Sequence, residues 1–164
     1  MWIAYGLVAL AVGMDLKTMR ISNRLILVGI GLALVQRWLC EGIAGVFTGI
    51  FLISFPVIVL YLLFLVGALG AGDIKLFSLI GGFVNLKELT GCMLFAFLFG
   101  AGFSFLKMLF SNTLLSSLKS VGNYILLLCK GERSAYITPN GEKGKIHFSV
   151  AIGLGLIAAR FVYA

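Results

Sequence analysis

Charge is scarce in this chain of 164 residues. Lys, Arg, Asp and Glu together make up 12% of it, against about 25% in an ordinary soluble domain. Hydrophobic residues make up 61%, and the mean hydropathy is +1.12. This composition excludes a soluble globular domain and indicates an integral membrane protein.

Histidine and cysteine are also rare, and their scarcity narrows the possible chemistry. His147 is the only histidine, which excludes an HExxH zinc helix and a two-histidine metal site. Cys40, Cys92 and Cys129 lie far apart and form no CxxC pair, which argues against a zinc ribbon and a disulfide framework. No GxSxG nucleophile motif occurs either. The sequence therefore predicts neither a metal nor another cofactor.

Long apolar runs dominate the chain. A bilayer core about 30 Å thick takes about 20 apolar residues per helical crossing, so these runs can be counted as spans. The predicted spans cover residues 1–16, 25–38, 43–69, 74–86, 89–110 and 146–163. The predicted fold class is therefore all-α, a polytopic transmembrane helical bundle of about six spans. We expect a single membrane-embedded domain over residues 1–164.

The basic residues predict the orientation in the membrane. The first loop holds Lys17, Arg20 and Arg24, and the long connection before the last predicted span holds five more. Basic loops stay in the cytoplasm, so the odd-numbered loops are predicted to be cytoplasmic. This accounts for the net charge of +7 without nucleic-acid binding. Within the long connection, helical spacing of apolar residues predicts an amphipathic cytoplasmic connector over about 111–145, as a surface segment or a substrate gate.

Asp15 and Asp73 are the only aspartates in the chain. Each lies at the margin of a predicted span, and the predicted orientation places both on the cytoplasmic side. Ionisable side chains at that depth usually face a bundle interior or a wet cavity and take part in function. The alternative is that each simply marks a helix end among the lipid headgroups. Two aspartates at one depth favour a shared site.

Paired carboxylates can hydrolyse a peptide bond without metal. The ionised carboxylate takes a proton from water, and the protonated one donates to the carbonyl oxygen or the leaving group. Like charges a few Å apart disfavour each other, so the pair holds one proton readily. Asp73 opens a predicted helix, where the dipole favours an anion, whereas Asp15 lies near the end of one. We therefore predict that Asp73 is the base and Asp15 the acid in the resting pair.

The residues around Asp73 suggest how it is presented. Gly70 and Gly72 permit positive φ and close backbone approach, which suits a non-helical segment that presents Asp73 to an extended substrate. A flexible turn is the alternative. Lys75, two positions after Asp73, does not face it on a helix and is expected to extend toward the cytoplasmic headgroups.

With both acidic segments described, the chain resembles the type IV prepilin peptidases, intramembrane aspartyl proteases with a GxGD motif. The stretch "GAGDIKL", residues 70–76, matches the family motif Gly-x-Gly-Asp-x-Lys. The stretch "DLKTMRISNRL", residues 15–25, matches an aspartate followed after five residues by Ile-Pro-Asn, with Ser22 in place of the proline. The first loop is short and lacks cysteine, so the chain resembles the peptidase-only forms. The residues that the resemblance implies are Asp15 and Asp73 as the catalytic pair, with Gly70, Gly72, Lys75 and Asn23 in support.

The resemblance also implies a substrate and a location. Prepilins carry a short basic leader, a glycine at the cut and then a hydrophobic helix, so the implied activity is removal of that leader at the cytoplasmic membrane face. The implied partner is a membrane-inserted prepilin-like protein, and the implied location is the inner membrane with the active site on the cytoplasmic side. From the residues alone, a small transporter or assembly subunit using Asp15 and Asp73 as a proton or cation relay stays an alternative, as does a purely structural membrane component.

Overall fold

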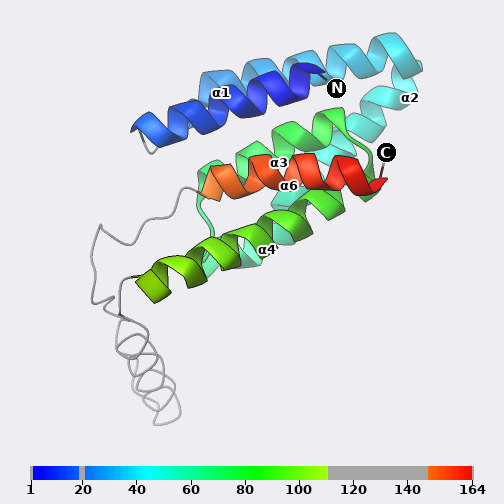
Figure 1. Cartoon of the computed structure of the whole chain (residues 1–164). Coiled ribbons are helices and arrows are strands. Elements are labelled where there is room, and N and C mark those ends of the chain that lie inside the picture. Colours follow the sequence, from blue (N-terminus) through cyan, green and yellow to red (C-terminus); the bar gives the residue numbers. More distant parts are fainter. Residues whose placement is uncertain (1, 19–20, 111–147, 164) are drawn as a thin grey trace. The chain divides into compact units, whose positions relative to one another are not determined.

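The computed structural model describes residues 2–18, 21–110 and 148–163, and the regular structure in that part is helical (Figure 1). The prediction of an all-α fold is confirmed. The helices are α1 (Trp2–Thr18), α2 (Asn23–Leu65), α3 (Ala71–Phe83), α4 (Leu86–Phe110) and α6 (Phe148–Tyr163). The chain divides into two compact units, residues 1–100 with 147–164 and residues 101–146. The predicted connector lies almost entirely outside the described residues, so it and the single-domain assignment stay predictions.

Helix α2 joins two of the predicted spans. Its backbone leaves the helical conformation at Gly42, where φ is 67° and ψ is −152°. A positive φ of this size is strained for residues with a Cβ, so glycine suits the position. The helix changes direction at this bend, and its two halves turn back on one another (Figure 1).

The predicted count of about six spans is not supported. Among the described residues, two helices are long and apolar enough to cross a membrane, Asn23–Leu65 and Leu86–Lys107. The 17 residues of α1, the 13 of α3 and the 16 of α6 fall short of the roughly 20 that a crossing takes. The predicted second and third spans lie on either side of the bend at Gly42, in the two halves of α2.

Helix α3 packs closely against both halves of α2. From Leu76 to Phe83 its residues are buried without exception. A Cβ on Gly82 would lie 2.6 Å from the Cβ of Ala33 in the first half of α2, and one on Gly81 would run into the backbone carbonyl of Leu52 in the second half. Larger residues at either glycine would push the helices apart. The close packing sets the position of α3, and with it the position of Asp73.

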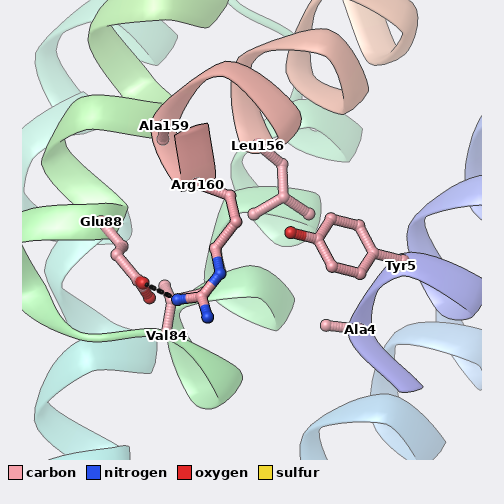
Figure 2. A pocket seen from close by; sticks show the side chains of 7 residues that line it. All are labelled: Ala4, Tyr5, Val84, Glu88, Leu156, Ala159 and Arg160. Atoms are coloured by element: carbon pink, nitrogen blue, oxygen red, sulfur yellow. Dashed lines mark hydrogen bonds and ion pairs between the residues drawn. The ribbon is translucent and has the colours of Figure 1, made fainter. Parts of the chain in front are cut away.

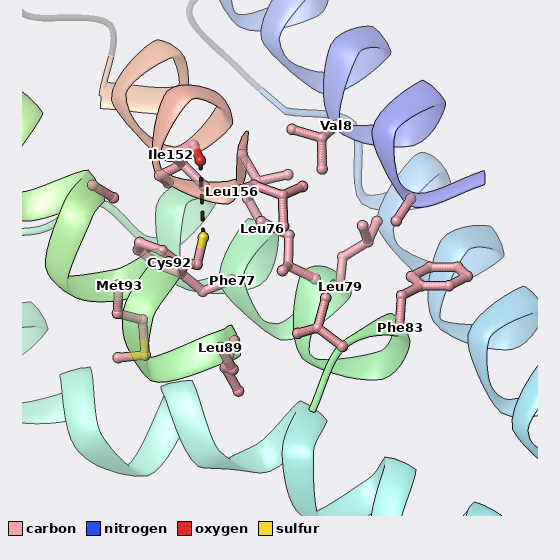
Figure 3. Packing of buried hydrophobic residues seen from close by; sticks show 14 of the residues in the cluster. Val8, Leu76, Phe77, Leu79, Phe83, Leu89, Cys92, Met93, Ile152 and Leu156 are labelled. Atoms are coloured by element: carbon pink, nitrogen blue, oxygen red, sulfur yellow. Dashed lines mark hydrogen bonds between the residues drawn. The ribbon is translucent and has the colours of Figure 1, made fainter. Parts of the chain in front are cut away.

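On its other side, α3 shares a hydrophobic core with α4 and α6 (Figure 3). Phe77, Cys92 and Ile152, one from each helix, are fully buried, and the Cys92 thiol donates to the Ile152 carbonyl oxygen at 3.9 Å. A Cβ on Gly155 would lie 2.7 Å from the Cys92 carbonyl oxygen, so α6 approaches the backbone of α4 directly. This packing holds the start of α6 beside the start of α3.

Charged side chains close the end of the bundle at which α3 finishes. Arg37 is 8% exposed, and its Nε and Nη2 atoms donate to the carbonyl oxygens of Gly82 and Val84, both at 2.7 Å. These carbonyls belong to the helix end, where intrahelical donors run out. Nearby, Arg160 on α6 pairs with Glu88 on α4 at 2.7 Å (Figure 2). These contacts tie α2, α3, α4 and α6 together at this end.

Candidate active site

Asp15 lies in the last turn of α1 and contacts the first turn of α6. The Ser149 hydroxyl donates to Asp15 Oδ2 at 2.6 Å, and Ser149 itself is fully buried. A short hydroxyl-to-carboxylate hydrogen bond is a strong one. Helix α6 therefore fixes the direction of the Asp15 side chain.

Asp73 lies in the first turn of α3, whose N-cap residue is Gly70. A Cβ on Gly70 would lie 3.1 Å from Asp73 Oδ2, so the glycine leaves room for the carboxylate over the helix start. The predicted non-helical segment is wrong from Ala71 onward, because the helix begins there and includes Gly72. Gly70 has an ordinary φ of −78°, so it supplies space rather than an unusual backbone conformation.

The two aspartates are close enough for their charges to interact. Asp73 lies just ahead of the predicted span 74–86, and burial raises its pKa from 3.8 to about 6. A hydrogen bond with the Gly70 backbone opposes the rise in the pKa of Asp73, and the negative charge of Asp15 adds to it. Its place at the start of a helix predicts Asp73 to be the base of the pair. Burial acts in the opposite direction, because it raises the pKa of Asp73 and so favours the acid role for this residue.

The two sequence motifs meet in the structure. Lys75 Nζ donates to Asn23 Oδ1 at 2.9 Å, which links the first turn of α3 to the first turn of α2. The Ile21 side chain lies 3.7 Å from where a Cβ on Gly72 would be. The prediction that Lys75 extends toward the headgroups is therefore incomplete, because its ammonium group also bridges the motifs. Asn23, Gly70, Gly72 and Lys75 all lie around the start of α3.

A cluster of three aromatic side chains lies one turn along α3 from Asp73. Phe77, one turn after Asp73, lies near Phe97 of α4 and Phe148 of α6, with ring centroids 6.4 and 6.5 Å away. Phe97 and Phe148 are 5.7 Å apart, which completes the triangle. Aromatic pairs at such distances add to the stabilisation from burial. The cluster therefore holds the starts of α3 and α6 in fixed relation, and Ser149 follows Phe148 directly.

Sequence reasoning missed Ser149. A lone serine near the start of the last predicted span carries no motif, and its partner Asp15 lies at the other end of the chain. The predicted orientation did contain a signal, since it placed the start of that span on the same membrane side as both aspartates. A polar residue at that depth was the one to examine.

The arrangement has the components of acid–base catalysis. One carboxylate accepts a short hydrogen bond from a buried hydroxyl, and the other binds its proton more tightly than an exposed aspartate does. Such a pair can remove a proton at one point of a substrate and deliver one at another. Within the described residues, no three His, Cys, Asp or Glu side chains are grouped so that they would hold a metal ion.

Comparison with known proteins gives one match. The family model described as the type IV leader peptidase family matches residues 2–105, more than half of the chain. The matched part contains Asp15, Asp73 and the contact between Asn23 and Lys75, and it ends before α6 with Ser149. No curated protein and no solved structure shows a significant match.

Proposed function

The chain belongs to the type IV leader peptidase family, and from this premise we propose that it is an aspartyl endopeptidase acting on type IV pilin-like precursors. It removes the basic leader peptide at the cytoplasmic face of the inner membrane. The observation that carries the proposal is the interaction of Asp15 with Asp73, which come from different helices and act on one another's charge. Both lie within the matched part of the chain.

The contacts support the following roles within the pair. Asp15, held by Ser149, is the base that takes a proton from water, and the resulting hydroxide adds to the carbonyl carbon of the scissile bond. Asp73, whose pKa is raised, donates its proton to the carbonyl oxygen. When the tetrahedral intermediate collapses, Asp15 passes its proton to the leaving nitrogen and one hydroxyl of the intermediate returns a proton to Asp73. Each carboxyl is then in its starting state.

The proposal includes a multi-pass position in the membrane with the active site on the cytoplasmic side. It is supported by the two long apolar helices and by the basic residues that follow Asp15 in the first loop. The partner is a membrane-inserted prepilin-like protein. Because enzyme and substrate share one bilayer plane, fewer relative orientations must be searched before the bond meets the carboxylates.

Co-expression with a leader-bearing pilin tests the function. We expect wild type to shorten the pilin on a gel, and Asp15→Asn and Asp73→Asn to leave it uncut while remaining folded in detergent. Glu41→Gln is the matched control, because Glu41 is a half-exposed carboxylate at the far end of the first half of α2. If either asparagine variant processes the pilin at the wild-type rate, the two-carboxylate mechanism is wrong. Absence of cutting by wild type, together with aspartate-dependent proton uptake into vesicles, would favour the relay alternative.

A further inference from the structure

A polar pocket lies at the opposite end of helix α3 from the carboxylates. Its volume is about 140 Å³, far more than a single water needs. The lining comes from the last turns of the first half of α2 and from residues at and just after the end of α3. The lining residues used below are Gln36, Arg37, Cys40 and Glu41 on α2 and Gly82 on α3.

Arg37 has hydrogen-bond donors to spare at this pocket, although its side chain is only 9% exposed. Its Nε and one N–H of Nη2 donate to the carbonyl oxygens of Gly82 and Val84. Its Nη1 lies 3.6 Å from Glu41 Oε2, which makes an ion pair but is too long for a hydrogen bond. Among the described residues, Nη1 and the second N–H of Nη2 therefore have no acceptor. A guanidinium group with free N–H groups suits the oxygens of a phosphate.

Gln36, one position earlier in α2, has the opposite requirement. Its side-chain oxygen Oε1 is buried and accepts no hydrogen bond from any residue that the structure describes. A buried acceptor without a donor is unfavourable, and most such atoms in proteins have a partner. A ligand with N–H groups would supply one. The pocket thus offers donors to an anionic group and an acceptor to a cationic one.

The charge of the lining distinguishes between possible ligands. Arg37 and Glu41 carry opposite charges, so the lining is close to neutral overall. A free anion would be repelled by the Glu41 carboxylate and would leave Gln36 Oε1 without a donor. A zwitterion with a phosphate and a primary ammonium brings an acceptor for Arg37 and a donor for Gln36. The lining therefore suits a zwitterion better than an anion.

The pocket lies at the level of a membrane surface. Asn23 opens α2 on the side of the aspartates, and the helix rises by about 26 Å from there to Cys40. A hydrocarbon core is about 30 Å thick, so the pocket is near its opposite margin. Trp38, which is 60% exposed, lies at the same level, and tryptophan is enriched at headgroup depth. Leu39 beside it is 78% exposed and offers apolar surface to lipid chains.

We propose that this pocket binds the phosphoethanolamine headgroup of a phospholipid, with the phosphate on Arg37 and the ammonium on Gln36 Oε1. The inference rests on the membrane position proposed above and not on the cleavage reaction, so a failure of one leaves the other standing. Phosphatidylcholine has no N–H group to donate, and phosphatidylglycerol has no ammonium group. Both lipids should therefore bind more weakly than phosphatidylethanolamine.

Lipid binding to the purified protein tests the proposal. Native mass spectrometry in detergent compares phosphatidylethanolamine, phosphatidylcholine and phosphatidylglycerol with the same acyl chains. For wild type we expect the apparent Kd of phosphatidylethanolamine to be at least tenfold lower than that of the other two. Equal affinities for the three lipids, as expected of a pocket that holds water alone, would overturn the proposal. Equally tight binding of glycerophosphoethanolamine, which has the headgroup without the chains, would show a soluble ligand and contradict a lipid.

Two variants locate the binding. Gln36→Leu removes the acceptor for the ammonium, and the fold should be kept because the lost oxygen is buried without a partner. Cys40→Trp places a bulky side chain in the pocket from an exposed position. Thr48→Val is the matched control, because Thr48 is an exposed polar residue on the same helix, outside the pocket.

We expect Gln36→Leu and Cys40→Trp to lose the preference for phosphatidylethanolamine, and Thr48→Val to keep it. The unfolding temperature is a second readout, because a ligand that binds only the folded protein stabilises it. Phosphatidylethanolamine should raise the unfolding temperature of wild type and Thr48→Val more than that of either pocket variant. A wild-type preference for this lipid in either folded pocket variant would contradict the site.

Discussion

The charged side chains at the two ends of helix α3 have different kinds of neighbour. Where α3 finishes, Arg37 donates to its last carbonyl oxygens and Arg160 meets Glu88, so each charge has a partner of opposite sign or a helix carbonyl. Where α3 begins, Asp73 has as its charged neighbour Asp15, of the same sign. The first arrangement stabilises the charged forms, and the second makes one of them harder to maintain.

This difference distinguishes charged side chains that stabilise the fold from charged side chains that take part in function. An ion pair such as that of Arg160 and Glu88 joins helices, and its energetic effect is on folding. Two like charges near one another repel each other and do not stabilise the fold. Their interaction gives the two carboxyl groups different proton affinities. Groups with perturbed pKa values are common at functional sites. We therefore expect the charged residues at the start of α3 to act in catalysis and those at its end to stabilise the fold.

The largest expected effect is on catalysis at the start of α3. Asp15→Asn and Asp73→Asn each remove one half of the acid–base pair, which is worth about 10² to 10⁴ in rate. Thermal stability should be kept or should rise, since the repulsion between the carboxylates is gone. Initial cleavage rates and unfolding curves of the purified variants check both statements. A large drop in unfolding temperature with modest loss of rate would place these aspartates in the structural class.

The next effect is on stability at the other end. Arg160→Ala leaves Glu88, whose side chain is 9% exposed, buried without its partner, and should cost about 3 kcal/mol of unfolding free energy. Glu88→Gln should lower the unfolding free energy by less, because it leaves no buried charge without a partner. The arginine that remains is 44% exposed, so water can solvate it. Denaturation in detergent gives both values. Cleavage per folded molecule should stay at the wild-type rate, and its loss without loss of stability would break the comparison.

Ser149→Ala should lower kcat about tenfold, because a hydrogen bond to a charged group is worth about 1.5 kcal/mol or more. Ser149→Thr keeps a hydroxyl and should restore part of the lost kcat.

Ser78→Ala is the matched control for Ser149. Ser78 is 5% exposed, and within the described part of the chain its hydroxyl has no hydrogen-bond partner. An equal loss of kcat in both alanine variants would mean that the Ser149 effect is one of packing.

The raised pKa of Asp73 predicts a pH dependence of rate. Asp73 must be protonated to act as the acid, so the rate should fall as pH rises through about 6. A profile that keeps rising well above pH 6 would show that Asp73 acts as the base.

Stability should follow the same group. The pKa of Asp73 in the fold is above its ordinary 3.8, so the stabilisation from binding this proton is complete below about pH 3.8 and is lost as pH rises through about 6. The unfolding temperature should therefore decline over this window more steeply in wild type than in Asp73→Asn. Parallel curves would contradict the assignment of the shift to Asp73.

The smallest effect concerns the contact between the motifs. Lys75→Met removes the hydrogen bond to Asn23, and because both side chains are exposed, the loss should be below about 1 kcal/mol. We expect less than a threefold change in cleavage rate. A loss as large as that of Asp73→Asn would move Lys75 into the catalytic machinery.

The helical class could be predicted from the sequence, because apolar runs are a local pattern. The positive-inside rule predicts that Asp15 and Asp73 lie on one side of the membrane. The count of about six spans is not supported, because α1, α3 and α6 are shorter than the roughly 20 residues of a crossing. Helix α3 is short and buried between others, which hydropathy alone cannot distinguish from a lipid-exposed crossing.

The burial of Asp73 could not be predicted from the sequence. A helix dipole can be inferred from a residue's place in a helix, but desolvation depends on what packs around the residue. Phe77 and Phe148 come from different helices, and their contact is visible only in the tertiary structure. The same holds for Ser149, which reaches Asp15 across nearly the whole length of the chain.

A titration of the two aspartate carboxyls tests the central claim most directly. Because the chain has two aspartates only, labelling aspartate with ¹³C shifts the carboxyl infrared bands of Asp15 and Asp73 away from all others. The account predicts that the pKa of Asp73 is about 6 in wild type and lower in Asp15→Asn, where the neighbouring charge is gone. A pKa of Asp73 that is the same in both proteins would contradict the pairing of the two carboxylates.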